Sequence, residues 1–560
     1  MQPSTDKAPP ISVLHEDLLF NIFFENTYLD FDNFESSFDT FFFRERIPDG
    51  GTEALITAQH CSLVSRQWRS IYLSSPSIWG RLISVDDLKR KTENWRNEVM
   101  ARTGEASLWV YGHLRDDETL HFVFPFLEQN WARVQMLFLI DNNPLEATQT
   151  RLTLADGQKR WAFLKEPAPQ LQRICITMSS PMDEAYLPPA RTLFSNNAPP
   201  LLRHFAVSDR IPQILSRRNL SSLSLSSKIP TEEFLKMLQE MPELLSLKIS
   251  GDLISKPNQE ACARVILPKL RMLFFGGGVS FLTAGTILQS ITPSSDCCLC
   301  APLESERLLD SGEYKQYETG LATFVLPYLS LHPPLSAVTL TLRNSCVVLQ
   351  SGPAFVITFS ARPPSVSSPA PLLKVLICSG AFSNVSTVRV ENTWSTSPQD
   401  FIHIFPEAFP SATTLIATDD IIQTLLQLDR NRMSTLLPSL VTLEVRNGTY
   451  SPGDHGVKES PHEQFLKLRK DLGLPLSVLN LGFIVNNFPV DLDYFELEHP
   501  GLLVKWSLKF VSEFKGNSNF EEYRCGDGHP ERLRFASLIM ELREEPENML
   551  FGVYIDWNYY

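Results

Sequence analysis

The sequence predicts an α/β chain in which a small all-α module precedes an irregular solenoid of strand-helix units. Three observations predict this class. Two N-terminal blocks carry apolar residues at helical spacing, a short leucine-based motif returns along most of the remaining chain, and several intervals between its copies have the pattern of an amphipathic helix. A chain of 560 residues is long enough for several domains, and a repeat architecture extends without one closed core.

The first helical block follows a polar, proline-containing stretch, residues 1–10, which we expect to be disordered. Glu16 and Asp17 stand in its first turn, where carboxylates suit the positive end of the helix dipole. Its apolar residues recur at helical spacing on one face and are Leu14, Leu18, Leu19, Ile22 and Phe23.

The second helical block comes after an insert, residues 25–55, and together the two blocks make up a module spanning residues 11–85. Its helical spacing is carried by Cys61, Val64, Trp68 and Ile71, and Pro76 and Trp79 follow as later anchors.

These blocks resemble the F-box family, whose pattern runs Leu-Pro-x-Glu-Leu-Leu-x-x-Ile-Phe, then Val-Cys-x-x-Trp-Arg, then Pro-x-Leu-Trp. The resemblance is confined to the N-terminal module. His15 stands where the family usually has proline, Ser65 where it often has cysteine and Ile78 where it often has leucine, and the insert is long. The alternative is two packed helices of some other α-helical cap.

The recurring motif consists of a leucine, two variable residues, a second aliphatic residue, one further residue and a third apolar residue. Its alternating half predicts a short strand, and proline often stands just before it. The copies begin at Val134, Leu171, Leu202, Leu220, Leu244, Leu270, Leu335, Leu373, Leu440 and Leu476, with a degraded copy at Ala412.

Helices are predicted between several copies. Residues 231–241 form an amphipathic pattern that Thr231 can cap, and residues 421–426 form another. A strand-helix unit cannot bury its own apolar face, so such units stack. The chain here resembles an irregular leucine-rich repeat protein, which implies a solenoid over residues 100–500 and a C-terminal cap over 501–560. A non-repeating α/β domain is the alternative.

Three segments interrupt these patterns. Residues 291–330 suggest a loop insertion, and residues 362–371 an extended linker. Residues 549–555 suggest a final strand. The N-terminal insert has rings at helical spacing with acidic residues between them, which predicts either a partner-binding acidic helix or local packing over the module. These rings are Phe31, Phe34, Phe38 and Phe41.

Charge and composition exclude several functions. Fifty basic against 64 acidic residues give a net charge of −14, which argues against binding to phosphate backbones or anionic lipid. No stretch is apolar enough to span a bilayer, and the N-terminus does not have the pattern of a signal peptide. We therefore expect a cytoplasmic or nuclear protein, with its nine cysteines as reduced thiols.

Residue patterns for catalysis or cofactors are weak. Cys297 and Cys300 have the spacing of half a zinc site, but no second pair accompanies them, so we expect loop thiols and no metal. Gly276-Gly277-Gly278 lacks the spacing of a phosphate loop and predicts a turn. No nucleophile elbow or supported Cys/His pair is present. We expect a non-catalytic chain without cofactors.

The F-box resemblance implies an SCF-type (Skp-cullin-F-box) E3 ubiquitin ligase. In that family the helical module docks on a Skp-type adaptor of a cullin-RING ligase, and the C-terminal domain holds a protein substrate for ubiquitin-dependent degradation. The residues that this resemblance assigns to the docking surface or its support are Leu14, Leu18, Leu19, Ile22, Trp68, Ile71, Pro76 and Trp79.

Substrate contacts are expected on the strand face opposite the core, because successive strand side chains alternate. The mixed character of these positions suggests a protein surface. The competing hypothesis is a repeat-based interaction scaffold that joins no ligase. The predicted contact residues are Arg173, Lys248, Phe274, Thr339, Glu444 and Asn480.

Overall fold

The computed structural model of the chain describes twenty stretches. They are residues 14–27, 50–114, 117–141, 158–178, 187–197, 199–207, 220–225, 229–254, 264–276, 278–301, 303, 311–331, 336–343, 346–351, 355–360, 382–392, 409–446, 460–483, 491–507 and 521–535. The chain divides into two compact units, Met1–Leu303 (unit 1) and Glu304–Tyr560 (unit 2). Each is mixed α/β with a mainly parallel sheet, an architecture compatible with a leucine-rich-repeat-like solenoid.

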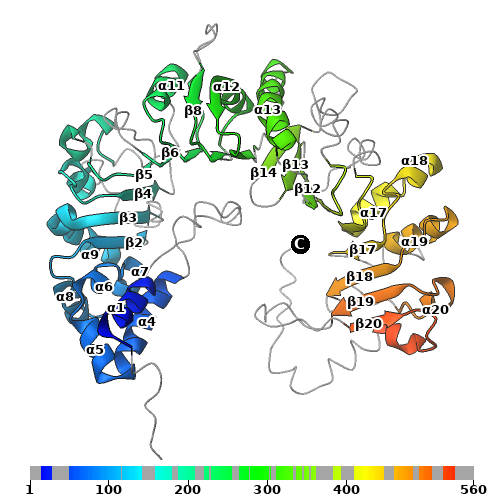
Figure 1. Cartoon of the computed structure of the whole chain (residues 1–560), viewed down its shortest axis with the longest axis horizontal. Helices are drawn as coiled ribbons and strands as arrows, with labels where there is room; N and C mark the ends of the chain where they lie inside the picture. The colour runs from blue at the N-terminus through cyan, green and yellow to red at the C-terminus, as the bar shows by residue number, and fades with distance from the viewer. Residues whose placement is uncertain are drawn as a thin grey trace, which may run out of the picture. The chain divides into compact units, whose positions relative to one another are not determined.

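Unit 1 begins with helices and continues with strands and intervening helices (Figure 1). Its helices are α1 (Glu16–Glu25), α4 (Gly50–Val64), α5 (Arg66–Leu73), α6 (Pro76–Gly80), α7 (Val85–Lys89), α8 (Glu93–Arg102), α9 (Asp117–Asn130), α11 (Thr231–Gln239) and α12 (Phe281–Ser290), with 3₁₀ helices η2 (Trp131–Arg133), η3 (Trp161–Lys165) and η5 (Ala190–Asn196). Its strands are β1 (Ile83–Ser84), β2 (Leu108–Leu114), β3 (Val134–Asp141), β4 (Arg173–Met178), β5 (His204–Val207), β6 (Ser222–Leu225), β7 (Ser246–Ile249), β8 (Val265–Leu267), β9 (Met272–Phe275), β10 (Ile291–Pro293) and β11 (Cys298–Ala301).

The sheet of unit 1 runs β1-β2-β3-β4-β5-β6-β7-β9-β11, and every neighbouring pair is parallel. The second aliphatic residue of each motif copy lies beside that of the next, as for Leu223 beside Leu247 and Leu247 beside Leu273. All three are fully buried. The predicted strands of this part of the chain are therefore confirmed, and their shared core is one continuous row.

Unit 2 has the same plan with a hairpin added. Its helices are α13 (Ser311–Leu331), α17 (Asp419–Leu425), α18 (Arg430–Thr435), α19 (Pro461–Asp471) and α20 (Phe495–Glu498), with 3₁₀ helix η8 (Pro530–Leu533). Its strands are β12 (Ala337–Arg343), β13 (Cys346–Ser351), β14 (Phe355–Ser360), β15 (Thr387–Asn392), β16 (Thr414–Ala417), β17 (Thr442–Val445), β18 (Val478–Phe483), β19 (Leu503–Ser507) and β20 (Glu521–Arg524).

In unit 2 the strands β12, β15, β16, β17, β18 and β19 are parallel neighbours in that order. Strands β13 and β14 extend the sheet antiparallel from β12, and β20 pairs antiparallel with β19. In the picture, helices α17, α18, α19 and α20 lie on one side of the parallel strands (Figure 1). The opposite strand face carries the side chains that alternate with the core residues.

The helices predicted between strands are present. Phe234, Leu235 and Leu238 of α11 are buried, as the amphipathic spacing predicted. Thr231 is the first residue of this helix and does not cap it, because Pro230 occupies the N-cap position and the Thr231 hydroxyl lies 3.4 Å from the carbonyl oxygen of Ile254. Helix α17 covers the other predicted segment.

The prediction of a loop insertion over residues 291–330 is wrong. This stretch contains β10, β11 and most of α13. Leu299 of β11 continues the core row beside Leu273, but Asp296 stands where other copies have their first leucine, so the motif is not recognisable. The charged start of α13 conceals its stripe, which consists of the buried residues Tyr314, Tyr317, Leu321, Phe324 and Val325.

One strand of unit 2 has no leucine motif. In β15 the three consensus positions are Val385, Val388 and Val390, all buried, and a leucine-based pattern misses them. The predicted linker 362–371, the copy that begins at Leu373, the strand 549–555 and the phenylalanine stripe of the insert lie outside the described residues. No helix within the described part of the chain is long and apolar enough to cross a membrane.

Candidate protein-interaction surfaces

Helix α1 has two apolar stripes with different surroundings. Leu19 and Phe23 are buried, with exposed fractions of 0% and 1%. Leu18 and Ile22, one residue before each of them, are 53% and 45% exposed. The apolar arc of α1 is therefore wider than the part that the chain itself buries. His15 caps the helix, because its Nδ1 accepts a hydrogen bond of 3.3 Å from the backbone N–H of Asp17.

The buried stripe of α1 packs on α5. The Phe23 ring lies edge-on to Trp68 at 4.9 Å and stacks on Tyr72 at 4.4 Å between ring centroids. Ser65 starts α5 by accepting a hydrogen bond of 3.1 Å from the N–H of Trp68, so serine serves here as an N-cap. Serine at this position thus has a structural role.

The junction of α4 and α5 exposes further apolar side chains. Leu63 and Val64, the last described residues of α4 before this junction, are 68% and 61% exposed. Helices α1, α4, α5 and α6 lie together at the N-terminal end of unit 1 (Figure 1). Among the described residues, six of the thirteen exposed large aliphatic side chains lie in three of these helices; they are Leu18, Ile22, Ile56, Leu63, Val64 and Leu73. Such a concentration marks a candidate docking surface.

The structure sorts the predicted docking residues into three sets. Leu18, Ile22 and Pro76 are exposed, whereas Leu14 and Trp68 are half-buried. The other three are core residues of the module, namely Leu19, Ile71 and Trp79. Sequence periodicity could not separate these sets, because both stripes of α1 have the same spacing.

Arg81 joins the helical module to the first strands. Its guanidinium carbon lies 3.4 Å from the ring centroid of Phe24 in α1 and 4.3 Å from that of Trp109 in β2. The chain then enters β1, which pairs with β2 through Ile83 and Val110. The helical module and the sheet of unit 1 therefore share one packed boundary.

The three predicted contact residues of unit 1 differ in burial. Arg173 and Lys248 are half-buried, and Phe274 is 9% exposed. Lys248 and Phe274 are register partners on β7 and β9, and the Lys248 Nζ lies 5.4 Å from the Phe274 ring centroid. The sheet thus brings together two of the three residues, with Arg173 further along on β4.

The predicted residues of unit 2 form a polar group. Glu444 and Asn480 are register partners, and the Asn480 Nδ2 donates to a Glu444 carboxylate oxygen at 3.3 Å. Arg446 Nε donates to the other Glu444 oxygen at 2.8 Å. Burial raises the pKa of Glu444, opposed by Arg389 and Asn480. Thr339 lies in β12 at the register position of Arg389.

Sequence reasoning missed an apolar cluster on the first strands of unit 1. Tyr111 of β2 and Met136, Phe138 and Ile140 of β3 pack together and are buried. These residues alternate with the core residues of the same strands, so both faces of β2 and β3 are apolar. The unbroken apolar run from Met136 to Ile140 was the available signal.

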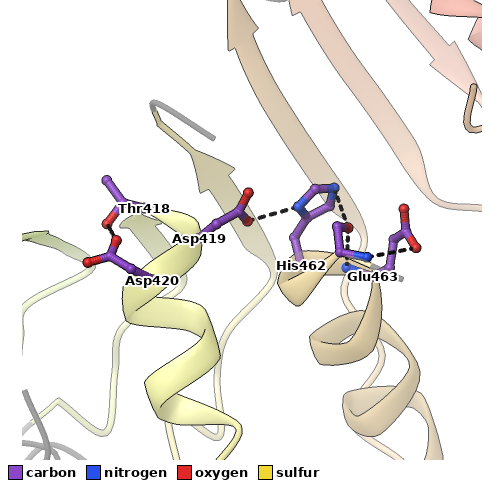
Figure 2. Close-up of polar contacts among 6 residues, drawn as sticks. Thr418, Asp419, Asp420, His462 and Glu463 are labelled. Carbon is purple, nitrogen blue, oxygen red and sulfur yellow. Dashed lines mark hydrogen bonds and ion pairs between the residues drawn. The ribbon is translucent and has the colours of Figure 1, made fainter. Parts of the chain in front are cut away.

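Unit 2 also contains a Ser-His-Asp arrangement (Figure 2). His462 Nδ1 lies 2.9 Å from an Asp419 carboxylate oxygen, and its Nε2 lies 3.0 Å from the Ser460 hydroxyl. All three side chains are buried, and Ser460 with Glu463 forms the capping box of α19. A nucleophile must reach substrate, so we interpret this group as a polar contact that joins α17 to α19.

The cysteine pair lies in and beside a strand. Cys297 and Cys300 are buried at β11, and burial raises the pKa of both thiols. Within the described residues, no three His, Cys, Asp or Glu side chains are grouped so as to hold a metal ion. After β9, a Cβ on Gly276 would lie 2.9 Å from the Ser250 hydroxyl oxygen, so the glycine permits close strand packing at the predicted turn.

Comparison with known proteins found one weak structural likeness and no sequence relative. No protein-family model and no curated protein sequence matches the chain. The solved structure of the leucine-rich repeat-containing protein LegL7 from Legionella pneumophila is similar over 69% of this chain and 93% of its own, at 10% identity and a TM-score of 0.26. The strand register of the chain itself supports the repeat architecture.

Proposed function

We propose that this chain is the substrate-recognition subunit of an SCF-type E3 ubiquitin ligase, docking on a Skp-type adaptor through α1, α4 and α5. The single observation that carries the proposal is the exposed stripe of Leu18 and Ile22 beside the buried stripe of Leu19 and Phe23. A helix that serves only its own core needs one apolar stripe. A second stripe on the same helix suits a partner that buries it.

The exposed side chains are large enough to support docking. Complete burial of a leucine, isoleucine or valine side chain contributes about 1.5–3 kcal/mol. In the free module each of four side chains is already partly covered, so only its exposed part can contribute further free energy on docking. These side chains are Leu18, Ile22, Leu63 and Val64. The remainder is still several times the contribution of a typical exposed ion pair.

In this proposal the chain is not an enzyme. The strand faces of the repeats hold a protein substrate, and other subunits of the cullin-RING ligase transfer ubiquitin. The contribution of this chain is positional, because holding the substrate raises its effective concentration near the conjugating enzyme. The proposed setting is the cytoplasm, the nucleus or both.

Binding to a purified Skp-type adaptor tests the proposal by titration calorimetry. Leu18→Asp places a charge in the proposed interface and should weaken binding by about thirtyfold or more. Leu497→Asp is the matched control, since Leu497 of α20 is 86% exposed and lies outside the module. Circular dichroism checks that both variants fold. Absence of binding by folded wild-type protein, or equal binding by both variants, would contradict the proposal.

A second candidate function is an interaction scaffold in which the helices only cap the sheet. The contact of Arg81 with Phe24 and Trp109 favours it, because this contact ties α1 to β2. Deleting residues 1–85 cannot separate the two functions, since the deletion also removes β1 from the sheet. Full-length wild-type protein that is folded and does not bind the adaptor would support the scaffold.

A further inference from the structure

The helical module passes into the sheet of unit 1 through a short, buried connection (Figure 1). Helix α6 ends at Gly80 and β1 begins at Ile83, so only Arg81 and Leu82 stand between them. Leu82 and Ile83 are buried, with exposed fractions of 0% and 1%. Movable domains are usually joined by exposed, flexible linkers, and this connection has neither property.

Arg81 holds the end of α1 against β2. Its guanidinium carbon lies 3.4 Å from the ring centroid of Phe24 and 4.3 Å from that of Trp109. A guanidinium is planar and stacks on aromatic rings, so one side chain serves both of them. The Arg81 Nη1 also donates to the carbonyl oxygen of Phe24 at 3.4 Å. The contact therefore reaches the helix that carries the exposed residues Leu18 and Ile22.

The sheet side of this contact is fixed in turn by β3. The Trp109 Nε1 donates to the side-chain oxygen of Gln135 in β3 at 2.8 Å. The Trp109 ring also packs against the buried apolar cluster of β2 and β3. The contact that begins at α1 thus extends across two strands of the sheet.

Helix α6 makes a second contact at the same junction. A Cβ on Gly80 would overlap the backbone carbonyl oxygen of Ser107, the residue before β2. Glycine is therefore required for α6 to lie this close to the chain that enters β2. Next to it, the Trp79 ring is covered by Arg102 of α8, whose guanidinium carbon lies 4.9 Å from the ring centroid.

We propose that Arg81 is a positioning residue, which fixes the orientation of the docking helices relative to the strand face of unit 1. This inference rests on the proposed function, in which the chain acts by holding a substrate near the conjugating enzyme. That effect depends on distance and orientation, so a module that turned freely would weaken it. Arg81 acts through Phe24 and Trp109 and needs no contact with adaptor or substrate.

Double electron–electron resonance on the full chain tests the proposal. One spin label replaces Glu16 of α1 and the other replaces Gln170, which stands shortly before β4; both residues are exposed. Bioorthogonal amino acids carry the labels, so the native cysteines stay in place. We expect one narrow distance distribution for the otherwise wild-type chain. In Arg81→Ala the fraction outside that peak should rise by about two- to thirtyfold, the range that corresponds to losing a cation–π contact.

Three further variants locate the effect. Arg90→Ala is the matched control, because Arg90 is an exposed arginine at the end of α7. Arg81→Lys keeps the charge without the planar stacking, so it should fall between alanine and wild type. Trp109→Leu removes the ring on the sheet side and serves as the test should Arg81→Ala fail to fold. Adding Arg81→Ala to Trp109→Leu should change the distribution little further, since both break the link between α1 and β2.

Adaptor binding by titration calorimetry separates positioning from a general loss of structure. Arg81→Ala should bind the purified Skp-type adaptor as tightly as wild type, because Leu18 and Ile22 of α1 are unchanged. Its complex with the adaptor should keep the broad distance distribution. A substitution that merely unfolded the module would reduce binding as well.

Four results would overturn the inference. They are an unchanged distribution in Arg81→Ala, equal broadening in Arg90→Ala, a distribution that the adaptor narrows to that of wild type, and loss of adaptor binding by Arg81→Ala alone. Wild-type protein that does not bind the adaptor contradicts the proposed function instead. The distances in the free chain then still decide whether Arg81 orients the helices, so the two failures are distinguishable.

Discussion

Each unit has a strand face built by the same alternation of core and non-core residues, and the two faces differ in chemistry. On unit 1, Arg173 of β4 and Lys248 of β7 stand on a face whose other described positions are mainly serine, cysteine and apolar residues. On unit 2, charged side chains in the described part of the face form ion pairs with one another. These pairs are Arg389 with Glu391 at 2.9 Å, Arg446 with Glu444 at 2.8 Å and Lys505 with Glu522 at 3.1 Å. The core residues determine the fold, and the alternate residues are left to determine what each face binds.

The layers of helices and connecting segments that pack on the sheets of the two units differ as well. In unit 1, the ring of Trp131 lies edge-on to Phe163 at 4.9 Å, and Trp161 packs on Phe124 at 5.0 Å. In unit 2, buried polar groups join neighbouring elements, as in the contact between His462 and Asp419. Apolar contacts tolerate small shifts, whereas a buried polar group without its partner costs about 1–3 kcal/mol. We therefore expect the layer of unit 2 to be the more sensitive of the two to single substitutions.

Arg469→Ala gives the largest expected effect. Arg469 of α19 is fully buried, and its guanidinium donates to the carbonyl oxygens of Leu436 at 2.7 Å and Leu437 at 3.3 Å. Among the described residues it has no carboxylate partner. Alanine would leave a cavity and two unpaired carbonyls, so the free energy of unfolding should fall by about 3–5 kcal/mol in urea titrations.

Two further variants test whether that loss of stability is specific to the buried Arg469 side chain. Arg430→Ala removes an exposed arginine of α18 and should change stability by less than about 0.5 kcal/mol. Arg469→Met keeps most of the side-chain volume and should fall between the two. A loss at Arg469→Ala no larger than that at Arg430→Ala would remove the contrast between the two helix layers.

Trp131→Phe tests the aromatic layer of unit 1. The Trp131 Nε1 donates to the carbonyl oxygen of Glu166 at 3.0 Å, and the ring is 3% exposed. Phenylalanine keeps an aromatic contact with Phe163 and loses the hydrogen bond and part of the volume. The expected destabilisation is about 1–2 kcal/mol, measured as above. The half-buried Trp95 provides a control as Trp95→Phe, with a smaller effect. A cost at Trp131 above that at Arg469 would reverse the comparison.

Much of the sheet was predictable from sequence, because its core positions repeat as leucine and other aliphatic residues. Prediction failed where valine or aspartate replaced leucine, as at Val385 and Asp296. The site was predictable only in part. Strand alternation placed Lys248 and Glu444 on the exposed faces, but helical spacing could not tell the exposed Leu18 from the buried Leu19, since burial depends on α5 packing against only one stripe.

The smallest expected effect concerns Glu444, whose ion pair distinguishes the face of unit 2. Burial raises its pKa above the ordinary value of 4.5, so in the folded chain the carboxyl holds its proton to higher pH than in the unfolded chain. Stability from this group is therefore present in acid and is lost as pH rises from 4.5 through the raised pKa. Glu444→Gln should flatten that part of the pH profile, measured by thermal unfolding.

The matched control for this prediction is Glu391→Gln, which removes a carboxylate of β15 that pairs with Arg389 at 2.9 Å. It should leave the pH slope attributed to Glu444 in place. If Glu444→Gln instead steepened the profile or lowered stability most in acid, the Glu444 carboxylate would be stabilised by Arg446 and Arg389 more than it is penalised by burial. Strong ion pairs would then stabilise the face of unit 2, which would widen its difference from the face of unit 1.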